Sequence, residues 1–326
     1  RTILNFLRDP AAPPAPGTAA ESQALCREAD YLGIRFFPFP LVYVLGGHDG
    51  VEHLSTVELL DIDGKCWRSC QPMPIERTFF GAEVFQSQLH LFGGQNREYK
   101  ALCETSKHDC LRGEWMAGAS LGMPRRNCAS AQDGHRIYAI GGFDGDRIMD
   151  SVEAFDPRMK SWQTVSPLTV PRSSAAAAVL GGRLWVVGGT SGRRLQTVEV
   201  FDPRANRWET FPVSINESRS AGASCVCRDR LFAMGGINEC NDIVRSMECF
   251  EQRDAGGGHW TYARSMRESR MDFAACEINQ MVMASGGQHG NVLASTEFYR
   301  PDLNDWQFGP SLLGPRYGHR SLVVSV

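Results

Sequence analysis

The sequence lacks the features of a membrane-spanning, nucleic-acid-binding or disordered chain. Its apolar stretches, of which 41–45 and 175–180 are typical, fall well short of the roughly 18 residues that a spanning helix needs. The net charge of −3 gives no overall attraction to nucleic acid or to an anionic membrane. With 42% hydrophobic and 22% charged residues, the composition is that of a soluble globular protein. We therefore expect no nucleic-acid partner and no transmembrane segment.

The eleven cysteines lack the spacing of a disulfide framework or of a metal site. The sequence has no C-x-x-C pair and no Cys–His cluster with zinc-finger spacing. Free thiols, buried or half-buried in a reducing compartment, are the expected state, ahead of a disulfide and of a bound metal. The sequence therefore predicts no metal and no cofactor.

Catalytic motifs are missing too, apart from fragments without their structural context. Residues 118–122 match the G-x-S-x-G pattern of serine hydrolases, but no helix is predicted after them to complete the turn that presents the hydroxyl group. No phosphate-binding G-x-x-x-x-G-K-[ST] loop occurs, and residues 61–64 lack the third ligand and the closing glutamate of a calcium loop. The eight histidines are dispersed, whereas an oxidase site needs clustered metal ligands. We expect no catalytic residue and no enzyme activity.

What the sequence does contain is an internal repeat, marked by four residue types in a fixed order. A Gly-Gly pair ends an apolar run six times, at intervals of 47, 48, 47, 47 and 51 residues, beginning at Gly46, Gly93, Gly141, Gly188, Gly235 and Gly286. A glutamate follows each pair: Glu58, Glu104, Glu153, Glu199, Glu248 and Glu297. A tryptophan comes next: Trp67, Trp115, Trp162, Trp208, Trp260 and Trp306. An arginine ends each unit: Arg77, Arg125, Arg172, Arg219, Arg270 and Arg316. Such regular recurrence indicates a repeat architecture.

The best-preserved unit predicts four short strands, at 173–180, 183–187, 197–201 and 207–211, with a turn at Asp202-Pro203. Four strands in one unit of this length are typical of a propeller blade. The first unit lacks an inner strand, and the segment 316–326 has no unit after it. We therefore expect the C-terminal strand to complete the first blade, which would leave no open sheet edge. The predicted fold is all-β, a six-bladed β-propeller over residues 37–326.

Because they carry the repeated Gly-Gly, Glu, Trp and Arg markers, residues 41–326 resemble Kelch propellers. Residues 3–8 and 25–34 resemble the closing helices of a BTB/POZ domain, joined by a Pro/Ala-rich loop at 10–20. This assigns residues 1–36 to the C-terminal part of a BTB/POZ-type domain, most of which we expect to lie outside the sequence. The segments 37–42, 124–127, 171–174 and 309–313 further resemble an apicomplexan branch of the Kelch family that is linked to artemisinin resistance.

The resemblance implies a BTB–Kelch adaptor in the cytoplasm. Such proteins form homo-oligomers through the BTB domain, which often engages a cullin-type ubiquitin ligase, while the propeller face holds a client protein. The apicomplexan branch is associated with peripheral endocytic structures. The alternative is a structural or cytoskeletal scaffold without a ubiquitin-ligase role, which the BTB remnant disfavours.

The six repeated arginines admit two roles: an electropositive mouth that grips carboxylates, or pairing with carboxylates and carbonyl groups between blades. An asymmetric client cannot need one residue six times, so repetition favours the structural role. By the same reasoning the repeated glutamates are expected to be interior and paired. The predicted protein-binding set contains the arginines and residues beside them: Arg77, Arg125, Arg126, Asn127, Arg172, Ser173, Ser174, Arg219, Ser220, Arg270, Arg316, Tyr317 and His319. Other candidates on the same rim are Phe79, Met271, His48, Asn96, Phe143, Asn238 and His289.

Two units depart from the repeat. The second unit, at 102–106, lacks the usual aromatic-Asp turn, and the fifth unit carries an insertion at 255–258.

Overall fold

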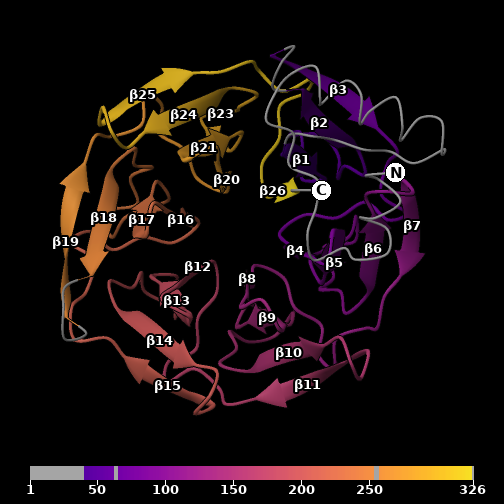
Figure 1. Cartoon of the computed structure of the whole chain (residues 1–326), viewed down its shortest axis with the longest axis horizontal. Helices are drawn as coiled ribbons and strands as arrows, with labels where there is room; N and C mark the ends of the chain where they lie inside the picture. Colours follow the sequence, from indigo (N-terminus) through magenta and orange to yellow (C-terminus); the bar gives the residue numbers. More distant parts are fainter. Residues whose placement is uncertain (1–39, 62–64, 253–256, 325–326) are drawn as a thin grey trace, which may run out of the picture.

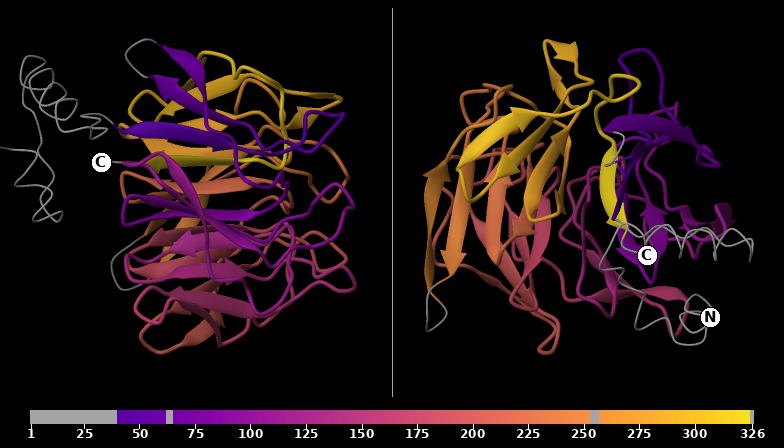
Figure 2. Two further views of the ribbon diagram at one scale, coloured as in Figure 1. Left: turned by 90° about the vertical axis from the view of Figure 1, so that its right-hand side faces the viewer. Right: turned by 45° about the horizontal axis from the view of Figure 1, so that its top comes forward.

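The computed structural model describes residues 40–61, 65–252 and 257–324, which form six four-stranded antiparallel sheets around a central axis (Figure 1). Figure 2 shows the ring from the side, with the loops of successive blades gathered at two opposite faces. The described residues contain no helix. The expected all-β, six-bladed propeller is confirmed. The BTB/POZ remnant predicted at 1–36 lies outside the described residues.

The blades follow one another along the chain, and their strands run from the axis outwards. The first blade contains β26 (Arg320–Val324), β1 (Leu41–Leu45), β2 (Val57–Asp61) and β3 (Cys66–Cys70). The second contains β4 (Gly81–Phe85), β5 (Gln88–Phe92), β6 (Thr105–Asp109) and β7 (Glu114–Ala117). The third contains β8 (Ala129–Gln132), β9 (Ile137–Ile140), β10 (Val152–Asp156) and β11 (Ser161–Val165).

The other three blades repeat this order. The fourth contains β12 (Ala176–Leu180), β13 (Arg183–Val187), β14 (Val198–Asp202) and β15 (Arg207–Thr210). The fifth contains β16 (Ala223–Cys227), β17 (Arg230–Met234), β18 (Met247–Gln252) and β19 (Gly258–Ala263). The sixth contains β20 (Ala274–Ile278), β21 (Met281–Ser285), β24 (Thr296–Arg300) and β25 (Asp305–Phe308), with a small hairpin of β22 (Gln288–His289) and β23 (Asn291–Val292) that the sequence did not predict.

The ring is closed by the strand at the far end of the sequence. In the first blade β26 pairs antiparallel with β1, with Val323 opposite Val42 and Ser321 opposite Val44. Figure 1 shows β26 as the innermost strand of a blade whose other strands come from the start of the propeller. The closure predicted from the incomplete first unit is confirmed: β26 pairs with the inner edge of β1 and gives the first blade four strands, like the other five.

The Gly-Gly pairs are required where the second strand of each blade turns sharply. In the fourth blade Gly188 has φ +63° and Gly189 has φ +90°, which L side chains rarely adopt. A Cβ atom on Gly188 would lie 2.4 Å from the carbonyl oxygen of Arg219, in the next blade. The pair therefore lets the backbone of one blade touch the arginine loop of the next.

The repeated tryptophans join neighbouring blades. Trp208, on β15, is buried and packs in one cluster with Tyr138 and Leu168 of the third blade and its connecting loop. Its indole nitrogen donates to the carbonyl oxygen of Ser166 at 2.9 Å, so the buried polar atom is satisfied. Burial of a side chain of this size stabilises the blade interface by several kcal/mol, on the order of 3–5.

Candidate binding face

One face of the propeller, called here the rim face, carries the loops after the Gly-Gly pairs and the starts of the inner strands. The six repeated arginines lie on this side, but each of these residues is at most 2% exposed. In the fourth blade Nη1 of Arg172 donates to the carbonyl oxygens of Gly188 at 2.9 Å and Thr197 at 2.8 Å. Its Nε donates to Glu199 at 2.9 Å.

Burial corrects the prediction of an arginine mouth. The guanidinium groups of Arg77, Arg125, Arg172, Arg219, Arg270 and Arg316 are oriented into the blades and cannot contact a partner at the surface of this conformation. The reason is that backbone carbonyl oxygens near each Gly-Gly pair need a donor, and a repeated arginine supplies it. This arrangement favours the structural alternative.

Five of the six repeated glutamates are buried and paired with these arginines, as predicted. Their ion-pair partners are Arg316 for Glu58, Arg125 for Glu153, Arg172 for Glu199, Arg219 for Glu248 and Arg270 for Glu297. Each carboxylate also accepts one or two backbone N–H groups from the loop before the arginine. In the third blade, for example, Gly122 donates to Glu153 at 2.6 Å.

The prediction is wrong for Glu104, which is exposed. On β6 the strand position of the other five glutamates belongs to Ser106, so Glu104 lies just before the strand. The buried Arg77 makes only backbone and hydroxyl contacts, donating to Gly93 at 3.2 Å, to the carbonyl oxygen of Glu104 at 3.1 Å and to Ser106 at 3.3 Å. Burial lowers the pKa of Arg77 to about 10.

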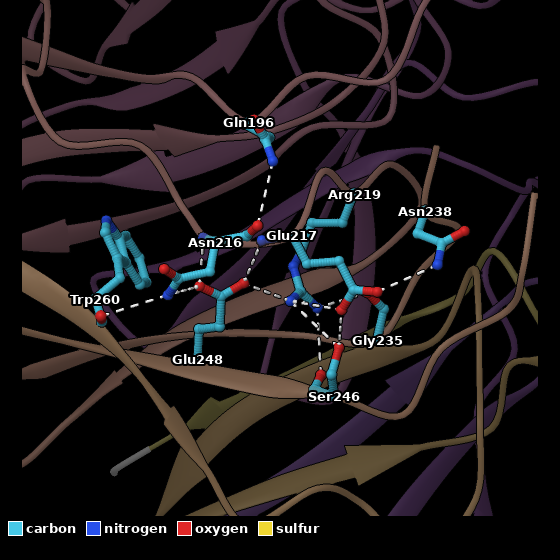
Figure 3. Close-up of polar contacts among 9 residues, drawn as sticks. All are labelled: Gln196, Asn216, Glu217, Arg219, Gly235, Asn238, Ser246, Glu248 and Trp260. Atoms are coloured by element: carbon cyan, nitrogen blue, oxygen red, sulfur yellow. Dashed lines mark hydrogen bonds and ion pairs between the residues drawn. The ribbon is translucent and has the colours of Figure 1, made fainter. Parts of the chain in front are cut away.

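The fifth blade shows the opposite case, with two carboxylates around one arginine (Figure 3). Nη2 of Arg219 lies 2.8 Å from Glu248 and 3.6 Å from Glu217. Glu217 also accepts hydrogen bonds from Ser246 and, at 3.2 Å, from Asn238. Asn238, a predicted recognition residue, is thus held in this network and in its own loop. The sixth blade repeats the second carboxylate with Glu268.

A closed ring of backbone hydrogen bonds surrounds the axis on the rim face. One residue per blade contributes, two positions after each arginine, and every one has a positive φ between 51° and 62°: Phe79, Asn127, Ser174, Ala221, Asp272 and Gly318. Each N–H donates to the carbonyl oxygen of the preceding member, at 2.7–2.9 Å, and Phe79 donates to Gly318 to complete the circle. Asn127 and Ser174 therefore contribute their backbones to the ring, while their side chains stay half-buried.

Aromatic and imidazole rings gather on the rim face where the sixth, first and second blades meet. We call them the aromatic patch: His48, His53, Phe79, Tyr99 and Tyr317. The centroid of the His48 ring lies 5.2 Å from that of Tyr317 and 4.8 Å from that of His53. The His53 ring in turn lies 5.4 Å from Tyr99, whose side chain is 63% exposed. Burial is the main reason that the pKa of His53 is lowered.

The third blade adds a cation beside this patch. The guanidinium carbon of Arg126 lies 5.1 Å from the centre of the Phe143 ring, a cation–π geometry. Arg126 also donates to Gln95 and, at 3.4 Å, to the carbonyl oxygen of Tyr99. Sequence reasoning found Arg126, Phe143 and Tyr317 but missed His53 and Tyr99. The signal for the missed pair was available, because both are aromatic-type rings in loops that do not repeat between units.

The other predicted residues divide by burial. Ser173 and Ser220 are buried at 7% and 6% exposure, and their backbones bridge to Thr190 and Ile237. His319 is wholly buried and its Nε2 lies 3.0 Å from Ser285 Oγ, so it cannot contact a partner directly. Met271 is half-buried, Asn96 holds its own loop through backbone N–H groups, and His289 is exposed at the β22–β23 hairpin.

No three His, Cys, Asp or Glu side chains of the described residues lie together as a metal ion would require. The ten cysteines among those residues are free thiols, and burial raises the pKa of Cys276 to about 12. No helix in the described part of the chain is long and apolar enough to cross a membrane.

Comparison with known proteins agrees with this architecture. A family model described as the KLHDC2/KLHL20/DRC7 Kelch-repeats domain matches residues 40–236, and a Kelch motif matches 218–267. The chain belongs to the Kelch-repeat family. The residues 218–267 that match the Kelch motif include Arg219, Gly235-Gly236, Glu248 and Trp260, so one family unit contains all four repeated markers.

Among curated relatives, the Kelch propeller is similar to Kelch-like protein 23 of Mus musculus, 25% identical over 87% of this chain and 42% of that protein. It is similar to Kelch-like protein 26 of Danio rerio, 25% identical over 82% of this chain and 38% of that protein. The chain thus spans less than half of these relatives. Among solved structures, that of YjhT has a TM-score of 0.67 at 16% identity, over 83% of this chain and 98% of that one, which shows the fold alone.

Proposed function

We propose that this Kelch propeller is a protein-recognition module that holds a client protein on its rim face, with the aromatic patch at the centre of the contact. The observation that carries the proposal is the non-repeating cluster of rings, next to the cation–π pair of Arg126 and Phe143. A client has no sixfold symmetry, so residues that occur in only one or two blades are suited to recognise it. Aromatic and arginine side chains are also the residue types that dominate binding energy in protein interfaces.

We further propose that the propeller serves a BTB–Kelch adaptor that delivers clients to a cullin-type ubiquitin ligase, assembles as a homo-oligomer and acts in the cytoplasm, at peripheral endocytic structures. Support comes from the BTB-like segments at 3–8 and 25–34, the apicomplexan-like segments such as 124–127, and the Kelch-like relatives, of which the chain spans less than half. A scaffold without a ligase role remains the alternative. Immunoprecipitation of the native protein distinguishes them, because only the adaptor brings a cullin and ubiquitylated client with it.

The rim face is tested with a double variant and a matched control. Tyr99→Ala with Arg126→Ala removes an exposed ring and a cation, and we expect client capture from native cells to fall by more than about tenfold. The control is Arg158→Ala with Arg204→Ala, two exposed arginines in the Asp-Pro turns on the opposite face. Both proteins should melt like the parent. If the control loses the client and the rim variant keeps it, the wrong face has been assigned.

A further inference from the structure

One inner strand carries a charged side chain at a position where the other five carry glycine or alanine. Four positions after the repeated arginine, the inner strands place Gly81, Ala129, Ala176, Ala223 and Ala274. In β26 the same position is Arg320. Arg320 lines a cavity of about 400 Å³ on the propeller axis, whose walls are formed by the six inner strands. A cavity of this size lies within the range of about 300–1,000 Å³ that is typical of small-molecule sites.

Two carboxyl groups lie in the blades on either side of β26, one on the inner strand β4 and the other in the loop before β20. Glu83 is on β4 and lines the same cavity. Its equivalents on the other inner strands are uncharged at neutral pH: Ala131, Ala178, Cys225, Cys276 and Leu322. Asp272, the one acidic member of the backbone ring, lies with Arg320 around a smaller space of about 40 Å³ at the rim end of the axis. The charged groups of the axis thus gather on three neighbouring blades, opposite alanine-rich strands.

These charges are not neutralised by one another. Nη2 of Arg320 donates to the carbonyl oxygen of Cys128 at 3.2 Å, and its buried Nε has no partner among the described residues. Burial raises the pKa of Glu83 to about 7 and that of Asp272 to about 6. In both cases burial outweighs a hydrogen bond, with Ser130 for Glu83 and with Gln288 for Asp272, and the attraction to Arg320. Burial also lowers the pKa of Arg320. The cavity therefore holds a cation and a carboxyl group that each lack a full counter-charge.

Access to the cavity differs at its two ends. The backbone ring narrows the rim end to the small space beside Asp272. The cavity lining continues to the far ends of the inner strands, at Val84, Gln132 and Glu277, so a ligand would enter from the face opposite the rim. The cavity is thus separated from the aromatic patch by the ring.

We propose that the axial cavity binds a small zwitterion of the amino-acid type, with its carboxylate on Arg320 and its ammonium group on Glu83. Arginine binds a carboxylate with two parallel N–H donors, and the guanidinium group of Arg320, which lines the cavity, has a single hydrogen bond among the described residues, from Nη2 to the carbonyl oxygen of Cys128. An anion alone would meet Arg320 but face Glu83 and Glu277, and a cation alone would face Arg320. Only a ligand that carries both charges is complementary to both Arg320 and Glu83. The inference is independent of the proposed client-binding function.

The test compares three probes that differ by one charged group: L-alanine, propionate and ethylamine. Each is titrated into the full chain by calorimetry at about pH 8, where Glu83, with a pKa of about 7, is ionised. We expect L-alanine to bind at least about tenfold more tightly than either single-charge probe. Equal binding of L-alanine and propionate, or no binding of any probe, would overturn the proposal.

The repeat itself supplies variants that the fold tolerates at other blades. Arg320→Ala gives β26 the residue found in four other inner strands, and Glu83→Ala gives β4 the residue found in two. Either change should weaken L-alanine binding by at least about tenfold while melting stays cooperative. Arg320→Ala should also remove propionate binding, and Glu83→Ala should retain it. The control is Arg136→Ala, outside the cavity lining.

Two results with these variants would contradict the proposed zwitterion site. Unchanged L-alanine binding in a folded Arg320→Ala or Glu83→Ala protein contradicts it, as does equal loss in the Arg136→Ala control. If Arg320→Ala does not fold, the Glu83→Gln variant and the three-probe comparison on the parent chain still test whether the cavity binds a zwitterion. Client capture by the rim face is measured separately, so failure of one proposal leaves the other to its own test.

Discussion

The second and fifth blades differ in how they hold their buried arginine. Both place a buried arginine next to a Gly-Gly pair, where it donates to backbone carbonyl oxygens. The fifth blade surrounds Arg219 with two carboxylates, whereas the second gives Arg77 a serine hydroxyl and no ion pair among the described residues. The constant feature is thus the set of backbone contacts. The carboxylate is an addition that one blade can omit.

The loop before each arginine explains why the second blade can lack the carboxylate. In each of the five ion-paired blades the carboxylate accepts one or two backbone N–H groups of that loop. In the fifth blade the donors are Asn216 and Glu217. The residue equivalent to Asn216 in the second blade is Pro74, which has no N–H group. Loss of the acceptor is therefore matched by loss of a donor, which avoids a buried unsatisfied group.

The largest expected effect comes from removing the carboxylate where no second one is present. Glu199→Ala in the fourth blade leaves the buried Arg172 without its counter-charge and the N–H groups of Thr169 and Val170 without their acceptor. We expect a loss of roughly 3–5 kcal/mol in the free energy of unfolding. Ser106→Ala in the second blade, measured by the same denaturant titration, should cost only about 1 kcal/mol. Equal costs would mean that the two blades do not differ as described.

The fifth blade should tolerate the same loss better than the fourth. In Glu248→Ala the carboxylate of Glu217, at 3.6 Å, remains beside Arg219. We expect a cost of about 1–3 kcal/mol, below that of Glu199→Ala. Adding Glu217→Ala should then cost more than Glu217→Ala does alone. An additive double variant would contradict the sharing of Arg219 by the two carboxylates.

The second blade can be converted towards the others. Ser106→Glu places a carboxylate opposite Arg77, but Pro74 offers it no N–H group. We expect Ser106→Glu to be more favourable by about 1 kcal/mol when Pro74→Gly is also present, because the new carboxylate then gains a backbone donor. A double-mutant cycle measures this coupling. A coupling near zero would show that the proline and the missing glutamate are unrelated.

The smallest effect concerns Glu83, a half-buried glutamate on β4 of the second blade. Its folded pKa of about 7 lies above its ordinary value of 4.5, so the folded state binds more protons between these two values. Its contribution therefore favours folding at low pH and is lost as the pH rises through about 7. We expect the parent to lose more stability than Glu83→Gln between about pH 5 and pH 8. Identical pH profiles of the two proteins would show that the pKa of Glu83 is not raised in the folded state.

The contrast between Glu104 and Ser106 shows where sequence reasoning is limited. Spacing alone placed Glu104 in the repeat, because it stands between a Gly-Gly pair and a tryptophan as the others do. Strand register decided otherwise, since a shift of a residue or two along β6 moves a side chain from a buried ion pair to the surface. Pro74 was visible in the sequence, but its meaning depends on knowing which carboxylate its neighbours contact.

The sequence by itself determined the blade number, the closing strand and the paired role of five glutamates. Periodic markers are local and repeat six times, so each unit corroborates the next. Only the tertiary structure decided that the arginines are buried, that His53 and Tyr99 join Tyr317, and that Arg320 and Glu83 share one cavity. These facts depend on contacts between blades that are tens to hundreds of residues apart in the chain. Spacing within one unit carries no information about which side chains of different units come together around an axis.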